Sequence, residues 1–430
     1  MAQLAEVFGV SKEMVLSYIE REQVDGTFRE ALNSDKHVIV YGSSKQGKSS
    51  LRQKHLSEDN ELLIQCGPQH DTTDIYASIL RQLGVQIETT TIEKSGDNGE
   101  VNSKITVKAA IPFIGEAGVE LGGRSGDVTE RTTSYKSVDI NLELAQDIGE
   151  LVRATGKSKF VVLENFHYLD DEVQQKLAFD LRSFQEIGVR FIILGIWRER
   201  NRLNQFNGDL VDRIIEIPIE PWEDNDFTEV IRKGTDLLNI RFSDGITNRI
   251  KDMSFGNIGI VQELCKQFCM ASEVTSTKAI RITLDEQTCL DIARAIKVQD
   301  YSSRHLRCLE SIADASRLYE RGLFLPYYIV KIIVQSDVNE LKQGLQRAEI
   351  HNKIRDAHYR PNDVRTGDMT NLLHGLGGLQ SKKAIVPPLF DYDRSNRTLR
   401  VIDSTLLFFL RFTDTQEVLD EIPDPTEDLE

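Results

Sequence analysis

His37-Val-Ile-Val-Tyr-Gly-Ser-Ser-Lys-Gln-Gly-Lys-Ser-Ser-Leu51 is the stretch of sequence that decides the fold of this chain. An apolar run, Val38–Tyr41, leads through Gly42–Ser49 into a helical run, Ser50–Leu56. The loop fits the pattern G-x-x-x-x-G-K-[ST], in the strand–loop–helix setting that such loops require. Its glycines let the backbone curl so that successive N–H groups face a polyphosphate, beside the positive end of the helix. A plain Gly-Ser turn would not need a lysine and a serine directly after the second glycine.

The loop supplies the groups that a nucleoside triphosphate needs. We expect Lys48 to reach the β- and γ-phosphates and the Ser49 hydroxyl to ligate Mg²⁺. The predicted ligands are therefore ATP and Mg²⁺. The residues expected to contact the nucleotide are Gly42, Ser43, Ser44, Lys45, Gln46, Gly47, Lys48, Ser49 and Ser50.

Composition indicates a cytoplasmic globular protein. With 430 residues, 40% of them hydrophobic and 28% charged, the chain predicts two or three domains. The sequence contains no run of about 18 apolar residues, the length needed to span a membrane, and Met1–Glu6 does not resemble a signal peptide. The cysteines form no C-x-x-C pair, so core packing is favoured over metal ligation. They are Cys66, Cys265, Cys269, Cys289 and Cys308.

The negative charge is concentrated at the end of the chain. Thr413–Glu430 carries eight acids and no base, and without it the formal net charge of −16 falls to −8. Tyr327–Arg411 is mildly basic, with 13 Lys and Arg against 9 Asp and Glu. This balance argues against indiscriminate nucleic-acid binding. We expect a solvated, disordered acidic tail, with an interaction tail as the alternative.

Apolar runs alternate with amphipathic helices on both sides of the loop. Leu62–Cys66 and Val189–Gly195 are typical of buried parallel strands, and Thr73–Leu83 and Val173–Ile187 of helices, so we predict an α/β fold with a parallel sheet. Val85–Asp139 interrupts this alternation with Thr, Val and Gly, and predicts an inserted β-hairpin or loop.

The segment before the loop predicts a helix over Val10–Ala31, with Ser11 as its N-cap. Such segments often form part of an adenine pocket. Tyr18, Ile19 and Arg21 are therefore candidates for base contacts, although core packing also explains the first two.

Lys159–Leu169 is the second chemically informative stretch. Four apolar residues end in Glu164, and a P-loop enzyme uses an acid at this place, on the neighbouring strand, to hold Mg²⁺. The next residue, Asn165, is an amide and cannot act as a general base. We therefore predict slow hydrolysis, or a base from elsewhere in the protein.

Three further polar residues follow the last strands of the predicted sheet. Glu199 and Asn201 are candidates for sensing the γ-phosphate. Arg213 precedes another strand, Ile214–Pro218, and is a candidate catalytic arginine acting in cis or across a subunit interface; a structural salt bridge is the alternative.

The order and spacing of Gly42–Ser49, Val161–Asn165, Phe191–Gly195 and Gly208–Pro218 resemble those of AAA+ and STAND ATPases. The similarity is to bacterial and archaeal branches that include origin-recognition and transposition-regulator ATPases. The resemblance implies a helical lid after the sheet domain. Three segments here predict the helices of such a lid: Trp222–Leu238, Ser243–Ser254 and Asn257–Ala271. Many relatives carry a nucleotide-sensing arginine in the lid, but Ile258–Ile260 contains none.

The C-terminal part is similar to a winged helix. Helices are predicted at His305–Ala315, Pro326–Gln335, Asp337–His358, Gly367–Gln380 and Ile402–Phe412, and wing strands at Ala384–Phe390 and Thr398–Ile402. Basic residues on or beside the predicted wing suit phosphates, although the small net charge and the lack of interleaved aromatic residues slightly favour a winged helix used for protein packing or autoinhibition. They are Lys382, Lys383, Arg394, Arg397 and Arg400.

These features predict a sheet domain at 1–221 with the insertion at 85–139, a lid at 222–299, a winged helix at 300–412 and a tail at 413–430. One functional hypothesis is a nucleotide-dependent switch or assembly ATPase, forming a homo-oligomer with a protein effector in trans. The resemblance places such ATPases in prokaryotic defence and mobile elements. The alternative is an ATP-controlled DNA-binding protein that uses the winged helix.

Overall fold

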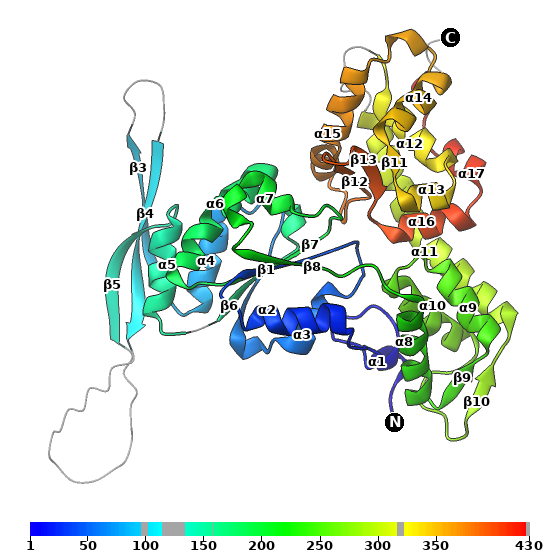
Figure 1. Ribbon diagram of the computed structural model, residues 1–430, viewed down its shortest axis with the longest axis horizontal. Coiled ribbons are helices and arrows are strands. Elements are labelled where there is room, and N and C mark those ends of the chain that lie inside the picture. Colours follow the sequence, from blue (N-terminus) through cyan, green and yellow to red (C-terminus); the bar gives the residue numbers. More distant parts are fainter. Residues whose placement is uncertain (96–101, 114–133, 158, 316–321, 427–430) are drawn as a thin grey trace.

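A parallel five-stranded sheet forms the centre of the computed structural model, which describes all residues except 96–101, 114–133, 158, 316–321 and 427–430 (Figure 1). The strand order is β2-β6-β7-β1-β8. The strands are β1 (His37–Tyr41), β2 (Glu61–Gln65), β6 (Phe160–Glu164), β7 (Phe191–Gly195) and β8 (Ile214–Pro218). The predicted α/β class with a parallel sheet is therefore confirmed.

Helices cover both faces of this sheet. One face packs against α2 (Thr27–Leu32) and α3 (Lys48–His55). The other packs against α4 (Thr72–Gln82), α5 (Ala145–Ala154) and α6 (Asp171–Ile187). Every residue of β1 and of β7 is buried. Because successive side chains of a strand point to opposite faces, both faces of these two strands are covered, and their sequences are therefore continuous and largely apolar.

The inserted segment forms an antiparallel sheet in the order β3-β4-β5. Its strands are β3 (Gln86–Ser95), β4 (Asn102–Phe113) and β5 (Ser134–Asn141). Ala109 and Ile140 join the core of the sheet domain and Ile87 and Val138 pack against it, while the described ends of β3 and β4 near residues 95 and 102 extend away from the body (Figure 1). The β character predicted here is confirmed, whereas the glycine-rich part of the insertion falls largely on 114–133, outside the described residues.

The helix predicted over Val10–Ala31 is wrong for most of its length. Residues 8–21 are irregular, between α1 (Leu4–Val7) and a π-helical turn, η1 (Glu22–Gly26), which leads into α2. The reason is tertiary: the Ser17 hydroxyl donates to the Val7 carbonyl at 2.6 Å, and the Tyr18 hydroxyl donates to Asp25 at 2.6 Å. These contacts outweigh a helical pattern that is only a weak local preference.

The lid helices are close to their predicted positions. They are α8 (Asp224–Leu237), α9 (Asp244–Met253) and α10 (Ile258–Ala271), with the short strands β9 (Ile240–Phe242) and β10 (Ile282–Leu284). The next helix, α11 (Gln287–Asp314), runs without a break through the boundary expected at 299/300. It joins the lid to the C-terminal region, and the two share one hydrophobic core. Within the described ranges, no helix has the apolar length needed to cross a membrane.

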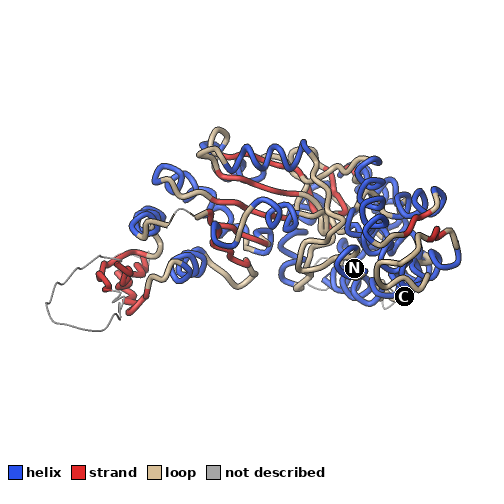
Figure 2. Tube along the Cα trace, turned by 90° about the horizontal axis from the view of Figure 1, so that it is seen from below, coloured by secondary structure: helices blue, strands red, loops and turns tan. Residues whose placement is uncertain are grey.

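The C-terminal region combines helices with a small antiparallel sheet, β11-β13-β12. Figure 2 shows the strand-rich arm at one end of the molecule and this helical part at the other. Its helices are α12 (Leu325–Gln335), α13 (Val338–Gln343), α14 (Arg347–Ala357), α15 (Thr366–Lys382), α16 (Ser404–Phe412) and α17 (Thr415–Asp420). Its strands are β11 (Leu345–Gln346), β12 (Phe390–Asp393) and β13 (Thr398–Val401).

Two predictions here need correction. The single helix expected over Asp337–His358 breaks at Gly344, whose φ of +94° lets β11 turn and pair with β13. The wing strand expected over Ala384–Phe390 begins only at Phe390, because Pro387 and Pro388 provide no N–H for a ladder. The predicted helix at Gly367–Gln380 is confirmed as α15, with open space beside Gly375, Gly377 and Gly378.

The tail predicted to be disordered folds back onto the C-terminal region at least as far as residue 426. Val418 of α17 and Ile422 are 1% and 4% exposed, and both join the shared core. The Tyr327 hydroxyl donates to Asp424 at 2.7 Å. The apolar residues spaced between the acids explain this outcome, because they give the segment a face to bury.

The docked tail predicts a stability effect at Val418. Replacing it with aspartate buries a carboxylate without a partner, and we expect a loss of about 2–4 kcal/mol of unfolding free energy. Urea unfolding measures this loss. Thr415→Asp, an exposed change in the same short helix, is the matched control and should change stability by less than about 0.5 kcal/mol. Equal effects of the two variants would contradict a packed tail.

Candidate phosphate-binding site

The loop between β1 and α3 has the curled backbone that the sequence predicts. Gly42 and Gly47 lie at φ values of +150° and +91°. A Cβ added at Gly42 would approach the Ile219 side chain to 2.5 Å, so this position has neither the backbone freedom nor the space for another residue. The N-terminus of α3 begins at Lys48, directly after the loop.

Lys48 lies folded across the loop. Its Nζ donates to the carbonyl oxygens of Gly42 and Ser43 at 3.0 and 2.6 Å. Burial lowers the pKa of Lys48 to about 8, while the nearby Glu220 and Glu164 act in the opposite direction. A polyphosphate would supply the missing countercharge to this buried ammonium group.

Ser49 and Glu164 are in contact as the sequence predicts, although Glu164 does not lie on the strand next to β1. The Ser49 hydroxyl donates a hydrogen bond to the Glu164 carboxylate. The strand that carries Glu164, β6, is not the neighbour of β1, because β7 lies between them. Contact arises because the start of α3 reaches across to the carboxyl end of β6.

The donors at this place fit a magnesium ion held partly by phosphate. A hydroxyl and a carboxylate oxygen are hard ligands, and Mg²⁺ commonly takes one or two such groups plus phosphates and water. In the described part of the chain, no group of three or more His, Cys, Asp and Glu residues forms a metal cage. Gln65 donates to Glu164 at 2.7 Å and accepts from Asn165 at 3.0 Å, so both side chains after β6 are held in place.

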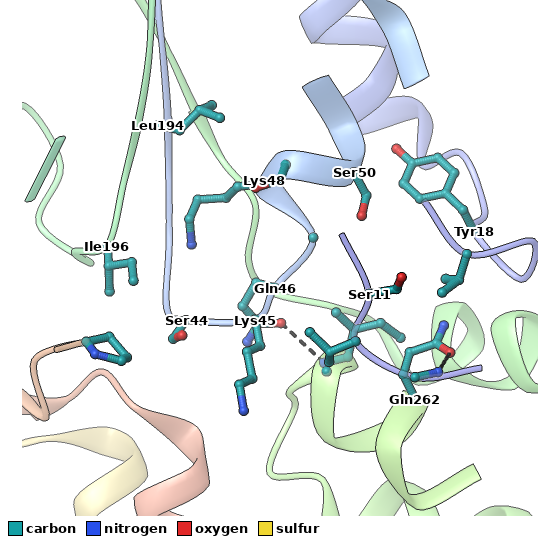
Figure 3. A pocket seen from close by; sticks show the side chains of 18 of the residues that line it. Ser11, Tyr18, Ser44, Lys45, Gln46, Lys48, Ser50, Leu194, Ile196 and Gln262 are labelled. Atoms are coloured by element: carbon teal, nitrogen blue, oxygen red, sulfur yellow. Dashed lines mark hydrogen bonds between the residues drawn. The ribbon is translucent and has the colours of Figure 1, made fainter. Parts of the chain in front are cut away.

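A cavity of about 300 Å³ opens beside the loop (Figure 3). Its lining includes Lys48, Glu164 and, from the irregular N-terminal segment, Tyr18 and Ile19. Two of the three candidates for base contacts thus lie at the cavity. Arg21 does not line it; its guanidinium carbon lies 3.7 Å from the ring centroid of Trp222.

The lid contacts the backbone carbonyl groups of the loop. Asn257 Nδ2 donates to the Ser44 carbonyl at 2.9 Å, and the Gly259 N–H donates to the Lys45 carbonyl at 3.0 Å. A Cβ added at Gly259 would lie 2.7 Å from that carbonyl oxygen. Asn257 and Gly259 thus place the start of α10 directly on the loop.

The C-terminal region reaches the same loop from another side. The Ser44 N–H donates to the Ile402 carbonyl at 3.3 Å, and Lys45 Nζ lies 5.0 Å from the ring centroid of Tyr301 in α11. On the C-terminal side, Arg304 of α11 fixes the segment before α16 through an ion pair with Asp403 and a 2.8 Å bond to the Pro387 carbonyl. Sheet domain, lid and C-terminal region thus converge on one loop.

Sequence reasoning missed two loop contacts, Arg198 and Glu220. Arg198 Nε donates to the Ser43 hydroxyl at 2.8 Å and its Nη2 pairs with Glu220 at 3.0 Å. Glu220 also accepts from the Ser43 N–H at 2.6 Å. Both residues follow strands adjacent to β1, and the shared edge of a parallel sheet is the signal that would have found them.

The two predicted candidates for sensing the γ-phosphate, Glu199 and Asn201, lie away from the loop. Glu199 accepts from Gln205 at 2.7 Å and lines a different cavity, beside α15 and β12. The Asn201 N–H donates to both Glu216 carboxylate oxygens at 3.0 Å. Neither residue lines the cavity beside the loop.

Arg213 is wrong as a catalytic residue acting in cis. Its carbonyl accepts from the His37 N–H at the start of β1, whereas the loop follows the end of β1. The side chain donates to Gln185 at 2.8 Å and pairs with Glu186 at 3.3 Å. A residue that precedes a parallel strand lies at the opposite edge of the sheet, which is why Arg213 forms a salt bridge there within its own chain. Its role across a subunit interface stays a prediction.

No protein-family model matches the sequence, and no curated protein matches it. Among solved structures, the Walker-type ATPase of Pyrococcus abyssi is similar, with 14% identity and a TM-score of 0.43 over 92% of this chain and 96% of that one. The ORC1 protein of Aeropyrum pernix, in complex with DNA, gives 11% identity and 0.39 over 96% and 95%. The RuvB Holliday junction branch migration motor of Thermotoga maritima gives 13% and 0.38 over 95% and 96%.

The geometry predicts different consequences for Ser49 and Arg213. We expect wild-type ATP affinity to be higher with Mg²⁺ than with EDTA, and Ser49→Ala to reduce that increment about tenfold by removing one metal ligand. Isothermal titration calorimetry measures both affinities. Arg213→Ala is the control and should change ATP affinity less than about twofold, because it alters only a partly exposed ion pair. A large effect of Arg213→Ala on the monomer's affinity would contradict this assignment.

Proposed function

We propose that this chain is a P-loop ATPase of the AAA+/STAND type that acts as a nucleotide-dependent switch or assembly factor. The observation that carries the proposal is the convergence of three parts of the chain on one phosphate-binding loop. Ser43, Ser44 and Lys45 contact the sheet domain, the C-terminal region and the lid. The proposed ligand is ATP with Mg²⁺.

In this structure the lid and the C-terminal region contact the loop directly, an arrangement that we call closed. Nucleotide binding competes with the closed arrangement for backbone groups of the loop. The Ser44 N–H faces the Ile402 carbonyl in the closed arrangement, and a polyphosphate cradled by the loop would draw on such N–H groups. Each hydrogen bond exchanged is worth about 0.5–1.5 kcal/mol net, so a few of them shift a two-state equilibrium substantially. ATP would thereby change how the lid and C-terminal region lie on the sheet domain.

The end of the loop and the end of β6 carry the residues proposed for hydrolysis. Lys48 would bind the β- and γ-phosphates, and Ser49 with Glu164 would hold Mg²⁺, which neutralises charge that develops on the transferred phosphoryl group. Asn165 would orient water but cannot accept its proton. We therefore propose turnover that is slow compared with typical enzymes.

The wider biological role is proposed from the family resemblance. The proposed role is that of a cytoplasmic homo-oligomer with a protein effector in trans, in a prokaryotic defence or mobile-element system.

We do not adopt DNA binding by the predicted wing as a second function, because its basic residues do not share one use. Lys383 lies 3.6 Å from Asp314, and Arg394 donates to the His374 carbonyl at 3.5 Å. Arg400 lines a cavity at the junction with the sheet domain, together with Arg198 and Glu220. Such dispersal does not favour a continuous phosphate-binding face.

Steady-state turnover and molecular mass test the proposed function together. We expect the purified protein to hydrolyse ATP below about 1 s⁻¹ and Lys48→Ala to abolish the reaction. Light scattering should give a larger mass in ATP than in ADP, and Lys48→Ala should remain at the ADP value. Equal masses in both nucleotides would contradict assembly driven by ATP alone.

Charge reversal at the predicted wing tests the DNA alternative. Each phosphate contact contributes about 0.9 to the slope of log affinity against log salt. We expect Lys382→Glu, Lys383→Glu and Arg397→Glu, combined in one variant, to leave this slope unchanged for duplex DNA. A fall in both slope and affinity, measured by fluorescence anisotropy, would restore the DNA-binding hypothesis.

A further inference from the structure

His167 lies at the cavity beside the phosphate-binding loop without a role in the site described above. It belongs to a short 3₁₀ turn, η3 (Phe166–Tyr168), which follows β6. Asn165, at a φ of +62°, bends the chain there, and the fully buried Phe166 ring anchors the turn against Trp197. This places the imidazole in the lining that also contains Lys48 and Glu164.

Neither ring nitrogen of His167 has a hydrogen-bond partner among the described residues, and both are shielded from solvent. Leaving a buried polar atom unpaired costs about 1–3 kcal/mol. Three other buried histidines keep at least one partner: His37 pairs with the Leu181 carbonyl and the Phe191 N–H, His358 with the Leu323 carbonyl and the Arg360 N–H, and His305 through one nitrogen with the Thr405 hydroxyl. Unpaired buried atoms at a cavity indicate a ligand that completes them.

The surroundings keep this imidazole uncharged. Burial, together with the nearby charges of Lys48 and Arg202, lowers the pKa of His167 to about 3. A neutral imidazole has one donor and one acceptor nitrogen, so it can donate to a phosphate oxygen and accept from water at the same time.

The position of His167 favours the terminal phosphate over the rest of the nucleotide. Lys48, which would face the β- and γ-phosphates, lies close enough for its charge to lower the pKa of His167, and Glu164, the candidate Mg²⁺ ligand, ends the strand that leads into the His167 turn. Tyr18 and Ile19, the candidates for base contacts, line the same cavity from the N-terminal segment. His167 also lines the second cavity, between the sheet domain and α15 of the C-terminal region. It therefore stands between the nucleotide and the part of the protein that would move.

We propose that His167 hydrogen-bonds to the γ-phosphate end of bound ATP and so distinguishes ATP from ADP. The inference rests on the proposed function, because it requires ATP in the cavity. It adds a residue that reads the terminal phosphate, at the junction with the C-terminal region.

Calorimetric titration with the non-hydrolysable analogue AMP-PNP and with ADP, both with Mg²⁺, tests the proposal. We expect His167→Phe, which keeps a ring but loses both nitrogens, to weaken AMP-PNP binding about tenfold and ADP binding less than about twofold. His167→Gln, which retains a donor and an acceptor, should recover part of the preference for AMP-PNP. His70→Phe, the same change outside the cavity, is the matched control and should leave both affinities unchanged.

The outcomes separate the two proposals. Wild-type affinities in His167→Phe, or an equal loss for both nucleotides, would overturn the role of His167 while leaving nucleotide binding intact. Failure of the wild-type protein to bind either nucleotide would instead overturn the proposed function, and this inference with it. Thermal unfolding without nucleotide shows whether each variant is folded; if His167→Phe is not, His167→Gln and His167→Ala are compared by the same two affinities.

Discussion

The curled backbone of Gly42–Gly47 is the constraint on which the rest of the structure depends. It leaves no room for a side chain at Gly42 against Ile219, and none at Gly259 against the Lys45 carbonyl. The lid therefore begins in direct contact with the loop instead of standing away from it. Because close-packed contacts of this kind are not continuously deformable, an anion that reshapes the loop must also displace the start of α10.

The division of the cores determines what can move. The two faces of the sheet have their own hydrophobic clusters, whereas the lid and the C-terminal region share a single cluster through α11. Between these halves the contacts near the loop are polar, such as Asn257 with the Ser44 carbonyl and the Ser44 N–H with the Ile402 carbonyl. Apolar cores hold each half together, and polar contacts can exchange with water, so the halves are suited to move as two bodies.

The closed arrangement also carries an electrostatic cost. Burial raises the pKa of Glu199 and of Asp391, which lie at the cavity between the sheet domain and the C-terminal region. Arg202 approaches Asp391 to only 3.8 Å, so the attraction offsets part of the desolvation penalty. An interface with such an internal opposition is one that a ligand of modest differential affinity can open.

The sequence by itself determined the features that depend on local chemistry. The glycine spacing and Lys48-Ser49 specified the loop, buried apolar runs specified the parallel strands, and helical periodicity placed α8, α9 and α10 within a few residues. Only the tertiary structure decided which distant groups meet. Arg213 lies at the edge of the sheet opposite the loop, and Arg198 and Glu220 contact the loop instead. Residues 8–21 are irregular because side-chain contacts hold them, and the acidic tail packs Val418 into the shared core. The reason is physical: backbone patterns act over a few residues, whereas strand order, burial and hydrogen-bond partners are set by segments far apart in the chain.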